Sequence, residues 1–231
     1  MEKEASERQK SILETIVQEY FLTAVPVSSG QLVEKYKLGV SPATVRNEMA
    51  ELEEEGLIYQ PHTSAGRIPT QAAYELLLAG YAGKYPALDK KEKELLEKSL
   101  GKSGSDFRQA AKSLAELSNG AVFWAFNKND LYHTGISNLF SQPEFGRLEM
   151  VCDASATIDR LEEIIDGVFE RLPEGLRVMV GSNNPFGDFL SVVLVKYKLG
   201  NVSGLFGIIG PLRMDYRHNL ALVDFIKTKI S

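Results

Sequence analysis

The chain has 231 residues, of which 44% are hydrophobic and 25% charged, and its net charge is −5. That length allows one large domain or two modest ones, and the composition is ordinary for a globular protein. No apolar run reaches the roughly 18 residues that indicate a membrane span, and residues 1–10 lack the apolar stretch of a secretory signal. The one cysteine, Cys152, excludes an internal disulfide. We therefore expect a cytoplasmic protein with no membrane partner.

Three helices are predicted in the first part of the chain. Apolar side chains in residues 7–22 recur with the helical period. Ser28, with Gln31 three residues later, has the spacing of a capping box and opens a short second helix, which we expect to end in a turn at Gly39. The third helix, residues 41–55, begins with a capping serine and a proline and stops before a glycine.

A short hairpin and a fourth helix follow. Residues 57–59 and 68–69 are predicted as two short strands, because residues 61–67 between them are rich in turn formers. A further helix is expected from residue 70 to about residue 82. Three helices, a hairpin and a helix, in this order, are typical of a winged helix-turn-helix domain, which we place at residues 1–85.

The remaining residues, 86–231, differ in character. We predict helices at 89–98, 107–117, 158–169 and 216–230, a hairpin of strands 121–126 and 131–136 with its turn at 128–130, and strands at 176–180, 189–197 and 202–209. A mixture of strands and helices of this kind predicts a second, α+β domain.

Charge argues against a nucleic-acid partner at first sight, because residues 1–83 hold seven Lys/Arg against twelve Asp/Glu. The distribution along the third helix answers this objection. At 100° per residue, one side carries Val45, Met49 and Leu52 and must face the core. The opposite side carries Ala43, Arg46, Asn47 and Ala50. We expect Glu48 and Glu51 on the flank and acids 53–55 as a solvated helix end, away from a DNA groove.

The outer side chains suit base recognition, because Arg46 can bond to guanine O6 and N7, Asn47 to adenine N6 and N7, and Ala43 can contact a thymine methyl. Hydroxyls at the start of the helix can bind phosphate, and Arg67 is expected at an exposed wing tip. An Arg–Asn pair on a solvated helix face also occurs in proteins that never bind DNA. The candidate DNA-binding residues are Ser41, Ala43, Thr44, Arg46, Asn47, His62, Thr63, Ser64 and Arg67.

Signs of catalysis or of a cofactor are absent from the sequence. His62, His133 and His218 are scattered, so no metal-ligand spacing exists. The glycines of residues 200–210 lack the Gly-Lys-Ser/Thr ending of a phosphate-binding loop. We expect neither a metal nor a cofactor, and a protein that is not an enzyme.

Residues 41–70, SPATVRNEMAELEEEGLIYQPHTSAGRIPT, resemble the signature of the HrcA family of heat-inducible transcription repressors. Residues 8–29 fit the same family, and the similarity returns at 138–145, NLFSQPEF, and at 207–216, GIIGPLRMDY. The match covers the winged helix fully and the second domain in patches.

The resemblance implies a repressor of chaperone genes that binds an inverted-repeat operator, CIRCE, as a homodimer. It also implies a GAF-like second domain that acts as a sensor, release of the operator on heat stress, and modulation by the GroEL chaperonin. A different interpretation is a one-component regulator whose GAF-like domain binds a small effector, near residues 181–184 or around Trp124.

The chain is shorter than is usual in the family, and most of an inserted dimerisation segment in the second domain is missing. Because a palindromic operator calls for a two-fold protein, other surfaces must then pair the two copies. The candidates are the predicted helix at 88–100 and the strand at 189–195, whose continuous apolar character predicts burial on both faces.

Overall fold

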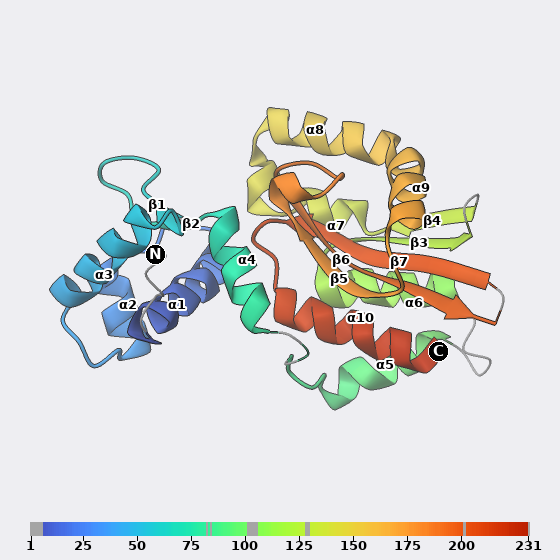
Figure 1. Cartoon of the computed structure of the whole chain (residues 1–231), viewed down its shortest axis with the longest axis horizontal. Helices are drawn as coiled ribbons and strands as arrows, with labels where there is room; N and C mark the ends of the chain where they lie inside the picture. The colour runs from blue at the N-terminus through green and yellow to red at the C-terminus, as the bar shows by residue number, and fades with distance from the viewer. Residues whose placement is uncertain are drawn as a thin grey trace. The chain divides into compact units, whose positions relative to one another are not determined.

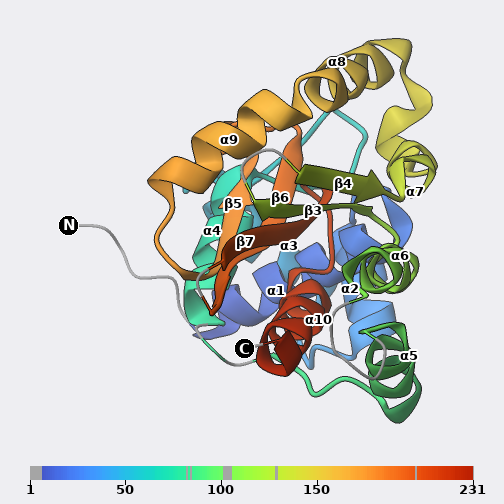
Figure 2. The same cartoon turned by 90° about the vertical axis from the view of Figure 1, so that its right-hand side faces the viewer.

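The computed structural model describes residues 7–81, 83, 85–100, 106–127, 130–200 and 202–230. The chain divides into two compact units, residues 1–82 and residues 83–231. Figures 1 and 2 show a mainly helical first unit and a second unit built on a sheet. The domain boundary that the sequence predicts is residue 85.

The first unit is a winged helix-turn-helix, as the sequence predicts. Antiparallel pairing joins Ile58 to Pro69 and Tyr59 to Ile68 to form the base of the wing. The core beneath it contains fully buried side chains from each of the first three helices, among them Leu13, Leu32 and Val45. The elements are α1 (Glu7–Thr23), α2 (Ser29–Tyr36), α3 (Pro42–Glu54), β1 (Ile58–Tyr59), β2 (Ile68–Pro69) and α4 (Gln71–Gly80) (Figure 1).

The ends of these helices follow from their capping residues. Ser28 and Gln31 form the full capping box that their spacing predicts. Helix α3 ends at Glu54, and Gly56 just beyond it has a φ of 72°, a left-handed conformation that glycine adopts without strain. Helix α2 stops at Tyr36, with Lys37 as its left-handed cap, slightly before the predicted turn at Gly39, whose φ of 69° is also left-handed.

The second unit is a five-stranded antiparallel sheet with helices on both faces, which confirms the α+β class. The strand order is β4-β3-β7-β6-β5. Helices α8 and α9 lie on one side of the sheet, and α5, α6 and α10 on the other (Figure 2). The strands are β3 (Ala121–Asn127), β4 (Asp130–Thr134), β5 (Gly175–Val180), β6 (Leu190–Leu199) and β7 (Val202–Pro211). The helices are α5 (Lys90–Leu100), α6 (Phe107–Ser118), α7 (Ile136–Phe140), α8 (Leu148–Asp159), α9 (Leu161–Arg171) and α10 (Tyr216–Ile230), with 3-10 turns at Pro143–Gly146 and Gly181–Asn183.

Two predictions for this unit need correction. The segment predicted as one helix at 158–169 is the end of α8 and most of α9, which are separated at Arg160. Ile136 begins α7 instead of ending a strand, because Gly135, with a φ of 75°, turns the chain out of the sheet. The turn predicted at 128–130 lies partly outside the described residues.

The regions that the sequence suggested for an effector are filled by the chain's own side chains. Trp124 is fully buried, stacks on Phe206 with 4.2 Å between ring centroids, and donates a hydrogen bond from Nε1 to the Tyr197 hydroxyl over 2.8 Å. The Asn184 amide Nδ2 donates to the carbonyl oxygens of Gly181, at 2.6 Å, and of Leu190, at 2.7 Å. These contacts give both regions a structural role.

The two candidate pairing surfaces are also covered within the unit. The apolar side chains Leu88, Leu96 and Leu100 are buried, with α6 and α10 packed against α5. Strand β6 lies between β5 and β7, so both of its edges are already paired, and its continuous apolar run is buried as predicted. Neither element offers a free apolar face to a second copy.

Candidate nucleic-acid interface

The outer face of α3 is exposed and carries small or polar side chains, as its periodicity predicts. Ala43, Arg46, Asn47 and Ala50 are exposed, while the opposite side of the helix is buried in the core. The Arg46 guanidinium has no ion pair or hydrogen bond with any residue that the structure describes. A cation that the fold itself does not use is therefore presented on this face.

Two acids of the same helix, Glu48 and Glu51, are hydrogen-bonded to α1. Glu48, expected on a solvated flank, is instead buried and accepts a hydrogen bond from Arg8 Nε of α1 over 2.6 Å. Glu51 accepts from Gln9 Nε2 of α1 over 2.7 Å. Arg8 of α1 thus balances the charge of Glu48, and the neutral Gln9 amide fixes the position of the Glu51 carboxylate without cancelling its charge.

Glu53 fixes the wing to the end of α3, so its assignment to a solvated helix end is wrong. Its Oε2 accepts from Arg67 Nε over 2.8 Å, and its Oε1 accepts from the backbone N–H of Gln60 over 3.1 Å. One carboxylate therefore bonds to both sides of the wing, and sets the position of the wing relative to α3.

Arg67 lies at the base of the wing, not at the exposed tip that the sequence predicts. Its side chain is 21% exposed and paired with Glu53. Its backbone forms a two-way bridge with Val27, with N···O distances of 2.9 and 2.8 Å. Gly66 permits this bridge, because a Cβ there would lie 2.4 Å from the carbonyl carbon and oxygen of Val27. The sequence pattern gives no sign of a contact between segments this far apart.

The wing loop presents His62, Thr63 and Ser64, which are all exposed. The loop is held from inside by Gln60, whose Nε2 donates to the carbonyl oxygens of Thr63, at 3.1 Å, and of Ala65, at 2.9 Å. Sequence reasoning missed Gln60, since a polar residue after a two-residue strand carries no periodic signal. The exposed hydroxyls are thus carried by an ordered loop.

The hydroxyls at the start of α3 are partly committed to the helix. Ser41 Oγ accepts from the Thr44 backbone N–H over 3.1 Å and lies 3.0 Å from Thr44 Oγ1. That contact uses one of the two hydroxyl protons, so one O–H of the pair remains available as a donor. The N-terminus of α3 therefore keeps a donor of the kind that phosphate contacts need.

A fourth acid, Glu19, joins α1 to α2. Glu19 is buried, with its Oε2 2.6 Å from Lys35 Nζ and 2.7 Å from the Tyr36 hydroxyl. These hydrogen bonds, from Lys35 first, lower the pKa of Glu19 below its ordinary value of 4.5. Burial, together with the Glu19 carboxylate, raises the pKa of Tyr36 to about 12. The pair holds the helix-turn-helix against the helix that supports it.

The described residues contain no group of three or more His, Cys, Asp or Glu side chains able to hold a metal ion. Among the same residues no helix has the length and apolar character needed to cross a membrane.

Two family models match this chain. Residues 4–81 match the winged helix-turn-helix transcription repressor, HrcA DNA-binding, and residues 71–219 match the HrcA protein C-terminal domain. The heat-inducible transcription repressor HrcA of Carboxydothermus hydrogenoformans is 26% identical over 332 positions, which cover 97% of each chain. The repressor of the same name from Streptomyces avermitilis is 58% identical over 81 residues, 35% of this chain and 24% of that protein. A crystal structure of a hypothetical protein superposes with a TM-score of 0.81 at 21% identity, over 99% of this chain and 98% of that one.

The alignment with the Carboxydothermus protein is longer than the chain itself, 332 positions against 231 residues. About a hundred of the aligned positions therefore have no residue in this chain. The likeness is also uneven, because identity is much higher over the short match to the Streptomyces repressor than over the full-length match.

Proposed function

Because the chain belongs to the HrcA family of winged-helix transcription repressors, we propose that it represses heat-shock genes by binding double-stranded DNA in a sequence-specific manner. Helix α3 enters the major groove and reads base edges with Arg46, Asn47 and Ala43. The wing residues His62, Thr63 and Ser64 contact the phosphate backbone.

The observation that carries this proposal is the division of charge around α3. Its outer face presents an unpaired Arg46 beside Asn47, while Glu48, Glu51 and Glu53 are bonded to α1 and to the wing. An acidic domain can bind a polyanion when its carboxylates are hydrogen-bonded within the protein and lie away from the contact surface. This arrangement is what base recognition requires of the helix.

The operator is an inverted repeat of the CIRCE type, bound by a homodimer, because two half-sites separated by helical turns match a two-fold protein. The pairing surface lies outside α5 and β6, whose apolar side chains are already buried. Analytical ultracentrifugation of the chain, free and on a full palindrome, is expected to show two copies on the DNA. A single copy on the palindrome under all conditions would contradict the dimer.

Release on heat stress is the second part of the proposal, supported by the names of the curated relatives, which are heat-inducible repressors. The second unit loses its fold on heating, and the operator becomes free when the GroEL chaperonin is occupied with other clients. Operator occupancy should fall across the melting transition of the second unit. Occupancy that persists well above the growth temperature, with or without chaperonin, would rule this mechanism out.

Selection of bound duplexes from a random pool, followed by gel-shift titration, tests sequence reading itself. Arg46→Ala is expected to weaken binding and relax the preference at one base pair, with a loss of about 1–3 kcal/mol. Arg67→Ala is expected to weaken all sequences evenly, because the arginine holds the wing. Equal and uniform losses for the two variants would mean that α3 does not read bases.

A further inference from the structure

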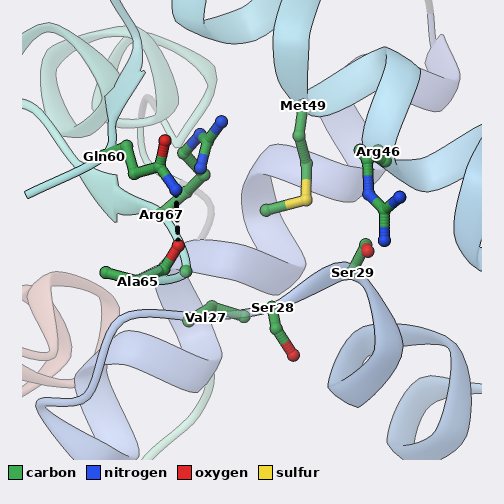
Figure 3. A pocket seen from close by; sticks show the side chains of 9 residues that line it. Val27, Ser28, Ser29, Arg46, Met49, Gln60, Ala65 and Arg67 are labelled. Atoms are coloured by element: carbon green, nitrogen blue, oxygen red, sulfur yellow. Dashed lines mark hydrogen bonds between the residues drawn. The ribbon is translucent and has the colours of Figure 1, made fainter. Parts of the chain in front are cut away.

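A hollow of about 250 Å³ lies in the first unit, between Arg46 and Met49 of α3, the start of α2 and the base of the wing. Because a water molecule occupies about 30 Å³ of liquid, this space admits a tetrahedral anion together with several waters. Figure 3 shows Met49 and Arg46 projecting from α3 and Ser29, the first residue of α2, facing the Arg46 guanidinium, whereas the Ser28 side chain points the other way. The lining residues are Val27, Ser28, Ser29, Arg46, Met49, Gln60, Ala65, Gly66 and Arg67.

The start of α2, where Ser28 and Ser29 line the hollow, leaves two backbone donors unused. Four N–H groups at the beginning of any helix lack an acceptor within the helix. The capping box satisfies two of them, since Ser28 N–H donates to the Gln31 side chain over 3.0 Å and Gln31 N–H donates to Ser28 Oγ over 3.3 Å. The N–H groups of Ser29 and Gly30 have no acceptor among the described residues. Both donors lie at the positive end of the helix dipole.

Ser29 gives an independent sign that something binds here. The residue is only 8% exposed, yet its hydroxyl has no hydrogen-bond partner among the described residues. It lines the hollow, and Figure 3 shows the Arg46 guanidinium extending toward it. The Oγ atom is open to the hollow rather than sealed from solvent, so its proton is free to be donated to a ligand seated there.

The charge of the lining fits an anion. It includes Arg46, which is unpaired, and Arg67, whose charge is balanced by Glu53 from outside the hollow. None of the described lining residues is an acid. A Cβ on Gly30 would meet nothing within 4 Å, so the fold itself does not need a glycine there.

We propose that this hollow is a seat for one backbone phosphate of the bound duplex, held by Ser29 Oγ and by the N–H groups of Ser29 and Gly30, with Arg46 at its rim. The inference rests on the proposed DNA binding and deepens it, since it assigns α2, from which sequence reasoning took no contact, a direct role. A phosphate seated here fixes the distance between the DNA backbone and the start of α3. The wing base closes the other side of the seat.

Ser29→Ala separates a ligand contact from a structural role. Because the hydroxyl has no partner in the protein, its removal should leave the free energy of unfolding unchanged or higher. Binding should weaken about tenfold, the size of one hydrogen bond to a charged group, on selected and random duplexes alike. Ser11→Ala, on the exposed face of α1, is the matched control, and should change neither quantity.

Neutral methylphosphonates, placed one at a time along the duplex that the chain binds, identify the seated phosphate. One position per half-site should weaken the unaltered chain, and the same substitution should cost the Ser29→Ala chain clearly less. Equal penalties for the two chains at every position would overturn the seat while leaving sequence-specific binding intact. Failure of the unaltered chain to bind any duplex would instead contradict the proposed function.

Inorganic phosphate distinguishes the backbone group from a free anion. A backbone seat predicts that millimolar phosphate competes no better than the same ionic strength of chloride. Release of DNA by low-millimolar phosphate, lost in Ser29→Ala, together with no methylphosphonate coupling, would show an effector site for free phosphate and overturn the proposal.

Discussion

The two units of the chain fix their important side chains by different means. In the second unit, Trp124 and its neighbours on the sheet are held by apolar burial and ring stacking. In the first unit, the parts of the DNA-facing surface are joined by carboxylates: Glu48 and Glu19 hold α1 to the helix-turn-helix, and Glu53 holds the wing. Both units have an apolar core, but only in the first do buried or half-buried carboxylates position the proposed binding surface.

This difference determines whether a substitution in each unit lowers stability or changes the geometry of a surface. Apolar burial is worth about 25 cal/mol per Å², so a large buried side chain contributes much to stability wherever it lies. A partly exposed ion pair contributes little to stability, because water and salt screen it. Loss of a pair in the first unit should therefore change the geometry of the binding surface more than the free energy of unfolding.

The largest expected effect is in the second unit. Trp124→Ala removes a fully buried indole and leaves the Tyr197 hydroxyl without its donor, and should cost about 3–5 kcal/mol of stability. Denaturant unfolding should show the loss in the transition of the second unit alone. Leu148→Ala, at a side chain that is 77% exposed, is the control and should cost almost nothing. A small loss for Trp124→Ala would mean that apolar packing does not dominate this unit.

Gly66→Ala is expected to have the next largest effect, and it falls in the first unit. The new Cβ would overlap the Val27 backbone and break the bridge that joins Val27 to Arg67. Overpacking of this kind costs about 1–3 kcal/mol, and the displaced wing should weaken DNA binding about tenfold or more. Gly80→Ala, where a Cβ meets nothing within 4 Å, is the control and should leave binding unchanged. Unimpaired binding by Gly66→Ala would show that the wing base does not position the DNA contact.

Prediction from the sequence succeeded where the signal is local. The bounds of α10, Tyr216–Ile230, and the capping box at Ser28 follow from apolar period and cap spacing alone. Helix α8 was missed for most of its length because it has little apolar stripe: Ala154 is the residue it buries. The outer face of α3 was also predicted correctly.

The roles of the charged residues did not follow from the sequence. Glu53 lies among three consecutive acids, and nothing local separates the one that bonds to Arg67 from its solvated neighbours. The contact joins residues fourteen apart through a hairpin whose geometry the sequence does not specify. The pairing of Glu48 with Arg8 could not be predicted either, because Arg8 lies forty residues away and only the fold brings the two together.

Glu53→Gln tests whether net charge near the DNA or the position of the wing controls binding. If only net charge mattered, removal of an acid near the DNA would strengthen binding. We expect instead weaker binding, by severalfold, with a stability loss of about 1 kcal/mol, because the Arg67 contact loses its charge. Glu54→Gln removes the same charge from an exposed neighbour and should bind slightly more tightly. Parallel gains for both variants would contradict a positioning role for Glu53.

The smallest effect, below about 1 kcal/mol, concerns Glu19. Its hydrogen bonds from Lys35 and Tyr36 lower its pKa below the ordinary 4.5, so the folded state favours the carboxylate. The resulting stability is present above the pKa of the unfolded chain and is lost as pH falls through the lower pKa of the folded chain. Denaturant midpoints of the first unit, measured between pH 7 and pH 3, should therefore fall less steeply on the acid side in Glu19→Gln. Glu14→Gln, an exposed site on the same helix, should keep the original acid slope; an acid slope unchanged in Glu19→Gln would mean that this carboxylate does not hold α1 to α2 through its charge.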